Sequence, residues 1–407
     1  MEEYRTYTLE ELSIGKGSYG IAASAVPFDA SLHTYLRITD INDDGSLNKS
    51  GLMSVDEDDV EKYLLKPNDI VFARTGNSTG RSYFYDGSDG ELVYAGFLIK
   101  FSLDSAKANP RILKYYTHSK PYYDWVQSFG TGSTRGNINA KTYGNMPITL
   151  PPRDIQDKIV DILKSLDDKI EVNRRINDNL EQQAQALFKS WFVDFEPFKD
   201  GEFKETEQGM IPKGWKASSL EDITVQKSER VGDRDDVKVL SPVTTGELML
   251  SEEYFTKQVF SESIAKYKVV ESGDFAYNPA RVNIGSLGRN NYDFDGCVSP
   301  VYVVFSCKDG YAHLFDLYRK TEKFKTEVNL RAIGGVRQSL NYKDFAFIQC
   351  IVPPHRVVEE FNAIYEHLLL MQKHTEEESE RLASLRDTLL PRLMSGELKV
   401  NEIEKVI

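Results

Sequence analysis

A polar, glycine-rich turn occurs twice in the 407-residue chain. The two copies, residues 73–81 and 280–290, both combine arginine, asparagine and glycine. Glycine lets a backbone approach its ligand closely, while guanidinium, amide and hydroxyl groups donate hydrogen bonds to phosphates and base edges. We therefore predict nucleic-acid contacts here, and the alternative is a polar surface hairpin. The candidate residues are Arg74, Asn77, Ser78, Thr79, Arg81, Arg281, Asn283 and Arg289.

A second repeated loop follows a run of glycines in each half of the chain. Its candidates are Arg135, Asn137, Asn139 and Lys141 in the first copy and Arg337, Gln338, Asn341 and Lys343 in the second. Arginine commonly pairs with guanine, asparagine or glutamine pairs with adenine, and lysine suits a phosphate. The two copies share these residues, although two domains that read different sequences would need different base contacts. Phosphate anchoring or maintenance of the fold is therefore favoured over base readout.

The sequence contains only fragments of known catalytic motifs. Residues 278–281 lack the second proline and the aromatic residue of an adenine methyltransferase, which would stack on a flipped base. Residues 202–204 resemble half of a nuclease motif that recurs easily by chance, and residues 73–81 lack the ending of a phosphate-binding loop. Three cysteines without a Cys-x-x-Cys pair argue against structural zinc. We predict no catalytic residues and no metal site.

The net charge of −13 opposes nucleic-acid binding for the chain taken as a whole. More than half of this charge lies on residues 151–200 and 353–407, so the rest is closer to neutral and leaves room for a positive face. Apolar residues make up 40% and charged residues 28%, which is ordinary globular composition. Because no long apolar run or signal segment is present, we expect no membrane association and a cytoplasmic location.

The repeated loops belong to a longer internal repeat. Arg135 recurs as Arg337, 202 positions later, and the match continues to Pro151-Pro152 and Pro353-Pro354. Upstream, β-branched and aromatic runs between glycine, aspartate and proline indicate strands. The repeat predicts four parts: a domain over 1–150, a helix over 151–198, a second domain over 199–352 and a helix over 353–407.

Both helical parts carry apolar residues in a 4-3-4-3 spacing, which predicts a heptad seam. The first helix should run from about Asp154 to Phe192. The second should start at Pro353-Pro354, run back antiparallel against the first and break at Pro391 and Gly396. The apolar seam of the first helix comprises Ile155, Ile159, Ile162, Leu166, Ile176, Leu180 and Leu187. Its polar interruptions, expected to fix the register, are Lys169, Asn173 and Gln183, with Thr375 and Glu378 in the second helix.

Aromatic residues gather where the first helix ends. Trp191, Phe192 and Phe195 are candidates for docking a protein partner. The alternative is an apolar plug that joins the helix to the second domain, with Pro197 ending the helix.

The helices and their flanks resemble the conserved regions of type I restriction-modification specificity subunits. The residues that carry this resemblance lie in 168–173, 180–192, 211–215 and 385–398. The similarity covers the whole chain and is weakest inside the two domains, and the start of the first domain has no counterpart of residues 211–215. The resemblance implies an α+β fold in which two mixed α/β target-recognition domains are separated by two long antiparallel coiled-coil helices, with a pseudo-twofold internal repeat.

In function, the resemblance implies a recognition subunit that binds double-stranded DNA at a split, asymmetric target and is not itself an enzyme. Two methyltransferase subunits would dock on the helices and hold S-adenosylmethionine, so no cofactor is expected in this chain. Restriction (motor) subunits would join through the complex. The alternatives are a pseudo-symmetric coiled-coil scaffold that binds only proteins and a standalone nuclease or methylase. The recognised bases and the spacer length stay open.

Overall fold

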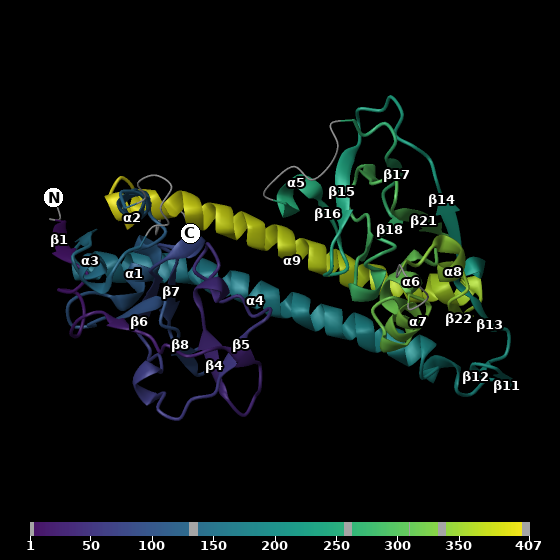
Figure 1. Cartoon of the computed structure of the whole chain (residues 1–407), viewed down its shortest axis with the longest axis horizontal. Helices are drawn as coiled ribbons and strands as arrows, with labels where there is room; N and C mark the ends of the chain where they lie inside the picture. The colour runs from purple at the N-terminus through teal and green to yellow at the C-terminus, as the bar shows by residue number, and fades with distance from the viewer. Residues whose placement is uncertain (1–3, 130–136, 256–262, 309, 333–338, 401–407) are drawn as a thin grey trace. The chain divides into compact units, whose positions relative to one another are not determined.

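The computed structural model describes residues 4–129, 137–255, 263–308, 310–332 and 339–400. The chain divides into two compact units (Figure 1). Unit 1 comprises Met1–Arg174 and Glu376–Ile407, and unit 2 comprises Arg175–Thr375. Both boundaries fall inside the two long helices, α4 (Arg153–Phe192) and α9 (His355–Ser395). Each unit therefore contains a segment of both helices.

Unit 1 holds two four-stranded sheets, in the orders β2-β9-β6-β7 and β3-β5-β4-β8, and a separate pair, β1-β10. Strand β4 runs parallel to β8, and the other strand pairs of these sheets are antiparallel. The strands are β1 (Arg5–Thr8), β2 (Ser18–Tyr19), β3 (Val26–Pro27), β4 (His33–Leu36), β5 (Met53–Val55), β6 (Asp69–Ala73), β7 (Ser82–Tyr85), β8 (Leu92–Tyr94), β9 (Leu98–Ser102) and β10 (Pro147–Leu150). The helices are α1 (Pro110–Tyr116), α2 (Lys120–Gln127) and α3 (Ala140–Gly144), with 3-10 turns η1 (Ile38–Asp40), η2 (Glu61–Tyr63) and η3 (Gly76–Ser78).

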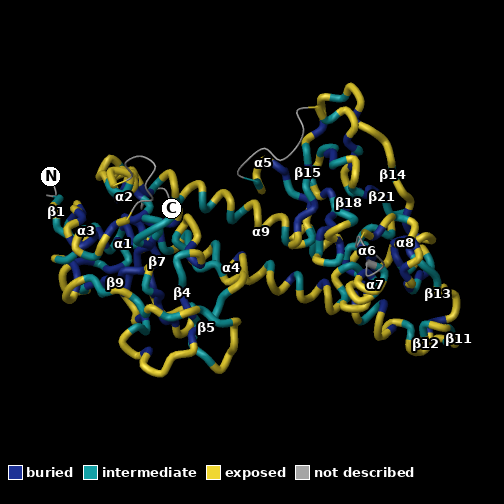
Figure 2. Tube along the Cα trace, viewed as in Figure 1, coloured by how far each residue is buried: buried dark blue, intermediate teal, exposed yellow. Residues whose placement is uncertain are grey.

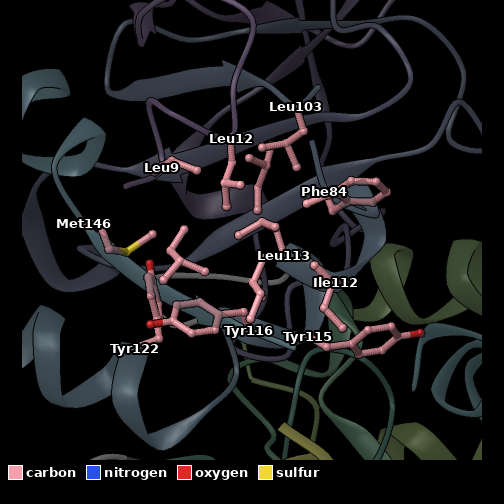
Figure 3. Packing of buried hydrophobic residues seen from close by; sticks show 14 of the residues in the cluster. Leu9, Leu12, Phe84, Leu103, Ile112, Leu113, Tyr115, Tyr116, Tyr122 and Met146 are labelled. Atoms are coloured by element: carbon pink, nitrogen blue, oxygen red, sulfur yellow. The ribbon is translucent and has the colours of Figure 1, made fainter. Parts of the chain in front are cut away.

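Strand β6 is buried along its whole length because it faces a different apolar cluster on each side. Ile70 and Phe72 join the larger core with α1, α2 and the unit 1 segments of α4 and α9, part of which is drawn in Figure 3. Val71 and Ala73 join a second cluster with residues of β4 and β8. Side chains alternate along a strand, so a run of five apolar or buried residues fits a strand packed on both faces.

Unit 2 repeats this architecture. Its sheets have the orders β14-β21-β18-β19 and β16-β15-β20-β17, and two further pairs are β11-β12 and β13-β22. The strands are β11 (Phe203–Thr206), β12 (Gly209–Pro212), β13 (Lys216–Ser219), β14 (Thr224–Lys227), β15 (Lys238–Pro242), β16 (Leu248–Leu250), β17 (Lys268–Val270), β18 (Phe275–Tyr277), β19 (Leu287–Arg289), β20 (Gly296–Val298), β21 (Val303–Cys307) and β22 (Gln349–Val352). The helices are α5 (Ser251–Tyr254), α6 (Ala312–Tyr318), α7 (Glu322–Ala332) and α8 (Tyr342–Ala346), with 3-10 turns η4 (Glu196–Phe198), η5 (Leu220–Asp222) and η6 (Val282–Ile284).

Strand direction and register confirm the internal repeat. The parallel pair β4-β8 recurs as the parallel pair β15-β20. The antiparallel bridge from Leu64 to Val93 recurs in the full pairing of β17 with β20, where Val269 faces Cys297. The pair β1-β10 recurs as β13-β22, so the first domain has this opening strand although it lacks the motif at residues 211–215. The predicted fold class, α+β with two mixed domains, two long antiparallel helices and an internal repeat, is confirmed.

The two long helices run antiparallel within each unit, because contacts to later residues of α4 come from earlier residues of α9. In unit 1, Asp167 contacts Arg386 and Asn173 contacts Glu378. In unit 2, Gln372 donates to the carbonyl oxygen of Asn177 at 3.5 Å, and the ring centroids of Phe192 and Phe361 lie 4.8 Å apart. Figure 2 shows exposed stretches along both helices, interrupted by buried positions. Within the described residues, no helix has the length and apolar character that a membrane span requires.

Two details of the predicted helices are wrong. Ile176, assigned to the apolar seam, is 36% exposed, whereas Ala184 and Phe188, which were not assigned to it, are buried. The predicted break at Pro391 does not occur, since α9 continues through Pro391 to Ser395 and ends before Gly396, whose φ is 74°. Proline removes one backbone donor, and the burial of Leu390 and Leu393 in the unit 1 core holds this last turn in place.

Candidate nucleic-acid interface

The first polar turn joins two core strands of unit 1, β6 and β7. The Gly80 amide donates to the carbonyl oxygen of Ala73 at 3.0 Å and closes the turn. Gly80 has a φ of 92°, and a Cβ at this position would lie 2.5 Å from a methyl carbon of Val126 in α2. The counterpart in unit 2, Gly285, has a φ of 97°. Both turns therefore depend on glycine for the same backbone conformation.

Arg74 links this turn to three neighbouring segments. Its amide donates to the carbonyl oxygen of Phe97 at 3.1 Å, and its carbonyl oxygen accepts from the amide of Ile138 at 2.9 Å. Its guanidinium carbon lies 5.0 Å from the ring centroid of Tyr19. The Nε atom of Arg74 is buried and has no hydrogen-bond partner among the described residues. The side chain is thus held on an aromatic surface, with the buried Nε donor unsatisfied by the described residues.

The other candidates in the turn divide into exposed and internally bonded residues. Asn77 is exposed, whereas Ser78 is buried. The Thr79 hydroxyl donates to a carbonyl oxygen within the turn at 2.8 Å. The Arg81 guanidinium pairs with the carboxylate of Asp43 at 2.7 Å. Arg74 and Asn77 are the turn residues best placed to meet a ligand, and the others hold the turn in shape.

The second repeated loop reaches the first turn. Thr75 and Asn137 form an antiparallel backbone bridge, and the Asn137 side chain is exposed. The two candidate regions of unit 1, far apart in sequence, therefore share one edge of the molecule. Three of the predicted residues, Arg135, Arg337 and Gln338, lie outside the described residues.

The asparagines shared by the repeated loops are helix caps. The Asn139 side chain accepts from the Thr142 amide at 2.9 Å, and the Asn341 side chain accepts from the Asp344 amide at 3.0 Å. Such bonds satisfy amides at the first turn of a helix that have no partner inside it. Maintenance of the fold, rather than base readout, therefore accounts for Asn139 and Asn341. Lys141, two residues after Asn139, is exposed and available to an anion.

The candidate residues of unit 2 do not all lie together. Arg281 is exposed and Asn283 is half-buried, and both lie in the turn between β18 and β19. Arg289 lies at the far end of β19 and donates to the carbonyl oxygen of Gly273 at 3.2 Å. It also lies 3.1 Å from Nδ1 of His313. Burial and the charge of Arg289 lower the pKa of His313, so the ring is neutral at pH 7 and can accept this bond. Lys343 is exposed on α8.

The aromatic residues at the end of α4 pack inside unit 2. Phe192 and Phe195 are buried, with ring centroids 5.9 Å and 5.3 Å from that of Trp215. Trp191 is half-buried, 5.9 Å from Phe361. This packing favours the apolar plug over a docking patch, and Trp215 belongs to the segment that opens the second domain. Beside the cluster, a cavity of about 430 Å³ is lined by residues that include Phe192, Phe195, Met210 and Cys350.

Two site residues were not singled out from the sequence, Tyr19 and Phe97. Tyr19 sits on the short strand β2, paired with Ile99, and its hydroxyl accepts from the Ala140 amide at 3.1 Å. Phe97 lies in the turn before β9, where its side chain is 59% exposed. Phe97 could have been found from the repeat, in which Val301 occupies its place. The sequence of residues 95–101 indicates a strand and by itself assigns no contact to Phe97.

Known proteins that are similar in sequence share one description. Residues 32–182 match the family described as the type I restriction modification DNA specificity domain. The chain is 28% identical over 312 residues to the type I restriction enzyme MjaIX specificity subunit of Methanocaldococcus jannaschii, covering 72% of this chain and 69% of the relative. It is 24% identical to the HindI specificity subunit of Haemophilus influenzae, covering 83% and 88%.

The fold has a counterpart among solved structures. A type I restriction-modification S subunit from M. genitalium aligns over 97% of this chain and 96% of its own, with a TM-score of 0.54 and 13% identity. That similarity concerns the fold, and the sequence matches concern the family. With the domain order, the internal repeat and the paired helices, the sequence matches lead to one conclusion: the chain is similar over most of its length to the specificity subunits of type I restriction-modification systems.

Proposed function

We propose that this chain reads a split, asymmetric DNA target, with one half recognised by each unit and the gap set by α4 and α9. One observation carries the proposal. The Ile138 amide binds the carbonyl oxygen of Arg74 in unit 1, and the Leu340 amide binds that of Pro279 in unit 2 at 3.0 Å. The same loop frame thus occurs twice with different side chains on it. A repeated frame with unlike polar groups suits two half-sites of different sequence.

The recognition mechanism in this proposal is positioning. The half-buried Arg74 and the exposed Asn77 and Arg281 would meet base edges in the groove, and Lys141 and Lys343 would meet phosphates. Phosphate contacts release bound counterions, so affinity should fall steeply with salt. The chain contributes the choice of sequence, and a partner contributes the chemistry.

We infer that two methyltransferase subunits dock on the helical segments and supply S-adenosylmethionine, and that restriction subunits join through them. The helical segments carry more than half of the net negative charge. An acidic surface repels DNA and suits protein partners. The chain itself would then be the non-catalytic recognition component.

The test is methylome sequencing of cells that express this chain together with a methyltransferase subunit of its own system, compared with cells that lack only this chain. We expect adenine methylation at a two-part motif with a fixed gap in the first cells alone. An identical methylation pattern in both would refute the proposal and favour the alternative, a coiled-coil scaffold that binds only proteins, to which the charge of −13 is equally suited.

A further inference from the structure

Each unit exposes one large apolar side chain at the same place in the repeat. Phe97 is 59% exposed and Val301 is 71% exposed. Strand pairing establishes their equivalence, because Ile70 faces Phe101 in unit 1 and Phe275 faces Phe305 in unit 2. Phe97 lies four residues before Phe101, and Val301 lies four residues before Phe305. A single exposed apolar residue needs no explanation, but its recurrence at equivalent places in both copies does.

The surroundings of Phe97 indicate what covers it. Its carbonyl oxygen accepts from the Arg74 amide, so the two residues are held side by side. The Arg74 guanidinium lies over Tyr19, which is 41% exposed, so the aromatic ring fixes the direction of the guanidinium next to Phe97. An apolar edge next to an oriented guanidinium matches a base-pair edge in the major groove. There, a thymine methyl group takes apolar contacts and guanine offers two acceptors to arginine.

We propose that Phe97 and Val301 make equivalent apolar contacts with base edges in the two half-sites of double-stranded DNA, and that Arg74 reads a base next to Phe97. This inference rests on the proposed function and names residues that determine specificity within it. In unit 2 the place of Arg74 is taken by Pro279, which has neither an amide donor nor a charge. The apolar contact is therefore common to both half-sites, and the guanidinium is particular to the first.

The experiment uses the complex of the full chain with its methyltransferase subunits, a duplex carrying the wild-type target and selection of targets from a random duplex pool. We expect Phe97→Ser to weaken binding to the wild-type duplex by about tenfold and to relax base preference in one half-site. Val301→Ser should relax the other half-site. Arg74→Lys keeps the charge but loses the paired donors, so discrimination at one G·C pair should fall roughly ten- to a hundredfold.

The matched control is Phe28→Ser, which changes the same residue type at 57% exposure in the same unit. It should leave affinity and selected target unchanged. Phe97→Leu retains an apolar side chain and should keep most of the affinity, which separates lost contact from lost folding.

The inference is overturned if Phe97→Ser selects the wild-type target with wild-type affinity, as the control does. In that case a wild-type complex that still selects a split target leaves the proposed function standing. If the wild-type complex selects no split target, the proposed function fails and this inference fails with it.

Discussion

The carboxylate of Asp167 in α4 accepts a hydrogen bond from the guanidinium of Arg386 in α9 at 3.0 Å. The same carboxylate accepts from Lys114 at 2.7 Å and from the Tyr115 hydroxyl at 3.1 Å, both in α1. One side chain thus ties a helix of the first recognition domain to both long helices. Asp167 is only 14% exposed, so these contacts are shielded from solvent.

We expect Asp167→Asn to lower the free energy of unfolding of unit 1 by about 2 kcal/mol, because it leaves two half-buried cations without their counter-charge. Asp168→Asn is the control, since Asp168 is 58% exposed and pairs with Lys164 on the same helix. It should cost less than about 0.5 kcal/mol. Hydrogen exchange of the α1 amides at increasing urea concentration measures the free energy of unfolding of both variants. Equal effects of the two substitutions would contradict the stabilising role of Asp167.

The same contact predicts a pH dependence. Burial alone would raise the pKa of Asp167, but the charges and hydrogen bonds of Lys114 and Arg386 hold it below its ordinary value. A carboxyl whose folded pKa is lowered stabilises the fold above its unfolded pKa of about 3.9 and loses that contribution as the pH falls through the folded value. The stability difference between wild type and Asp167→Asn should therefore be constant near neutral pH and shrink below pH of about 4. A difference that grows on acidification would refute this.

The helix caps predict a change in stability without a change in specificity. Asn139→Ala and Asn341→Ala should each cost about 1 kcal/mol, because the first-turn amides of α3 and α8 lose their acceptors. Asn139→Asp keeps the acceptor and should stay close to wild type. Unfolding curves give the stability, and target selection gives the specificity. An altered half-site in Asn139→Ala at unchanged stability would show that this side chain reads bases.

The exposed lysines next to these caps predict the opposite behaviour. Lys141→Ala and Lys343→Ala should weaken binding to all duplexes alike and should each reduce the slope of log affinity against log salt by about 1. The control is Lys120→Ala, since Lys120 is 79% exposed in α2 and pairs with Asp124. Titrations at several salt concentrations decide between the outcomes. A slope equal to that of the control would remove Lys141 and Lys343 from the phosphate contacts.

Matched insertions in the two long helices test how the gap in the target is set. Seven residues added after Arg174 in α4 and seven after Thr375 in α9 leave both units intact, since these are the unit boundaries. Each insertion adds about 10 Å of helix, so the spacer should lengthen by roughly three base pairs with both half-sites unchanged. An insertion in α4 alone mismatches the helices and should abolish binding to the split target. An unchanged spacer after the double insertion would disprove the role of the helices.

The order of domains and long helices could be predicted from the sequence because the two halves of the chain repeat each other. The predicted first helix, from about Asp154 to Phe192, is one residue shorter than α4. The polar interruption at Asn173 is a buried contact with Glu378, as the seam suggested. Ile176 lies outside the buried face although its seam neighbours Asn173 and Leu180 are buried, so the heptad spacing did not predict every position.

The site was harder to predict because a sequence names residue types but not their partners. Arg74 and Arg81 occupy one turn, yet Arg81 pairs with Asp43 while Arg74 lies over Tyr19. Both partners come from segments more than thirty residues away. The cap role of Asn139 depends on where α3 begins, which is the least certain feature of any short helix. Shared asparagines could therefore not be separated from base readers without coordinates.

The division of the chain through both long helices has a consequence during synthesis. Unit 2 is one continuous stretch, Arg175–Thr375, so all of its residues have been made before α9 is complete. Unit 1 is made of the residues before and after that stretch, and its core includes Leu390, Leu393 and Val400 from the later part. The first domain to leave the ribosome is therefore the last to close, and until then its nascent chain exposes the apolar surface that those three residues cover.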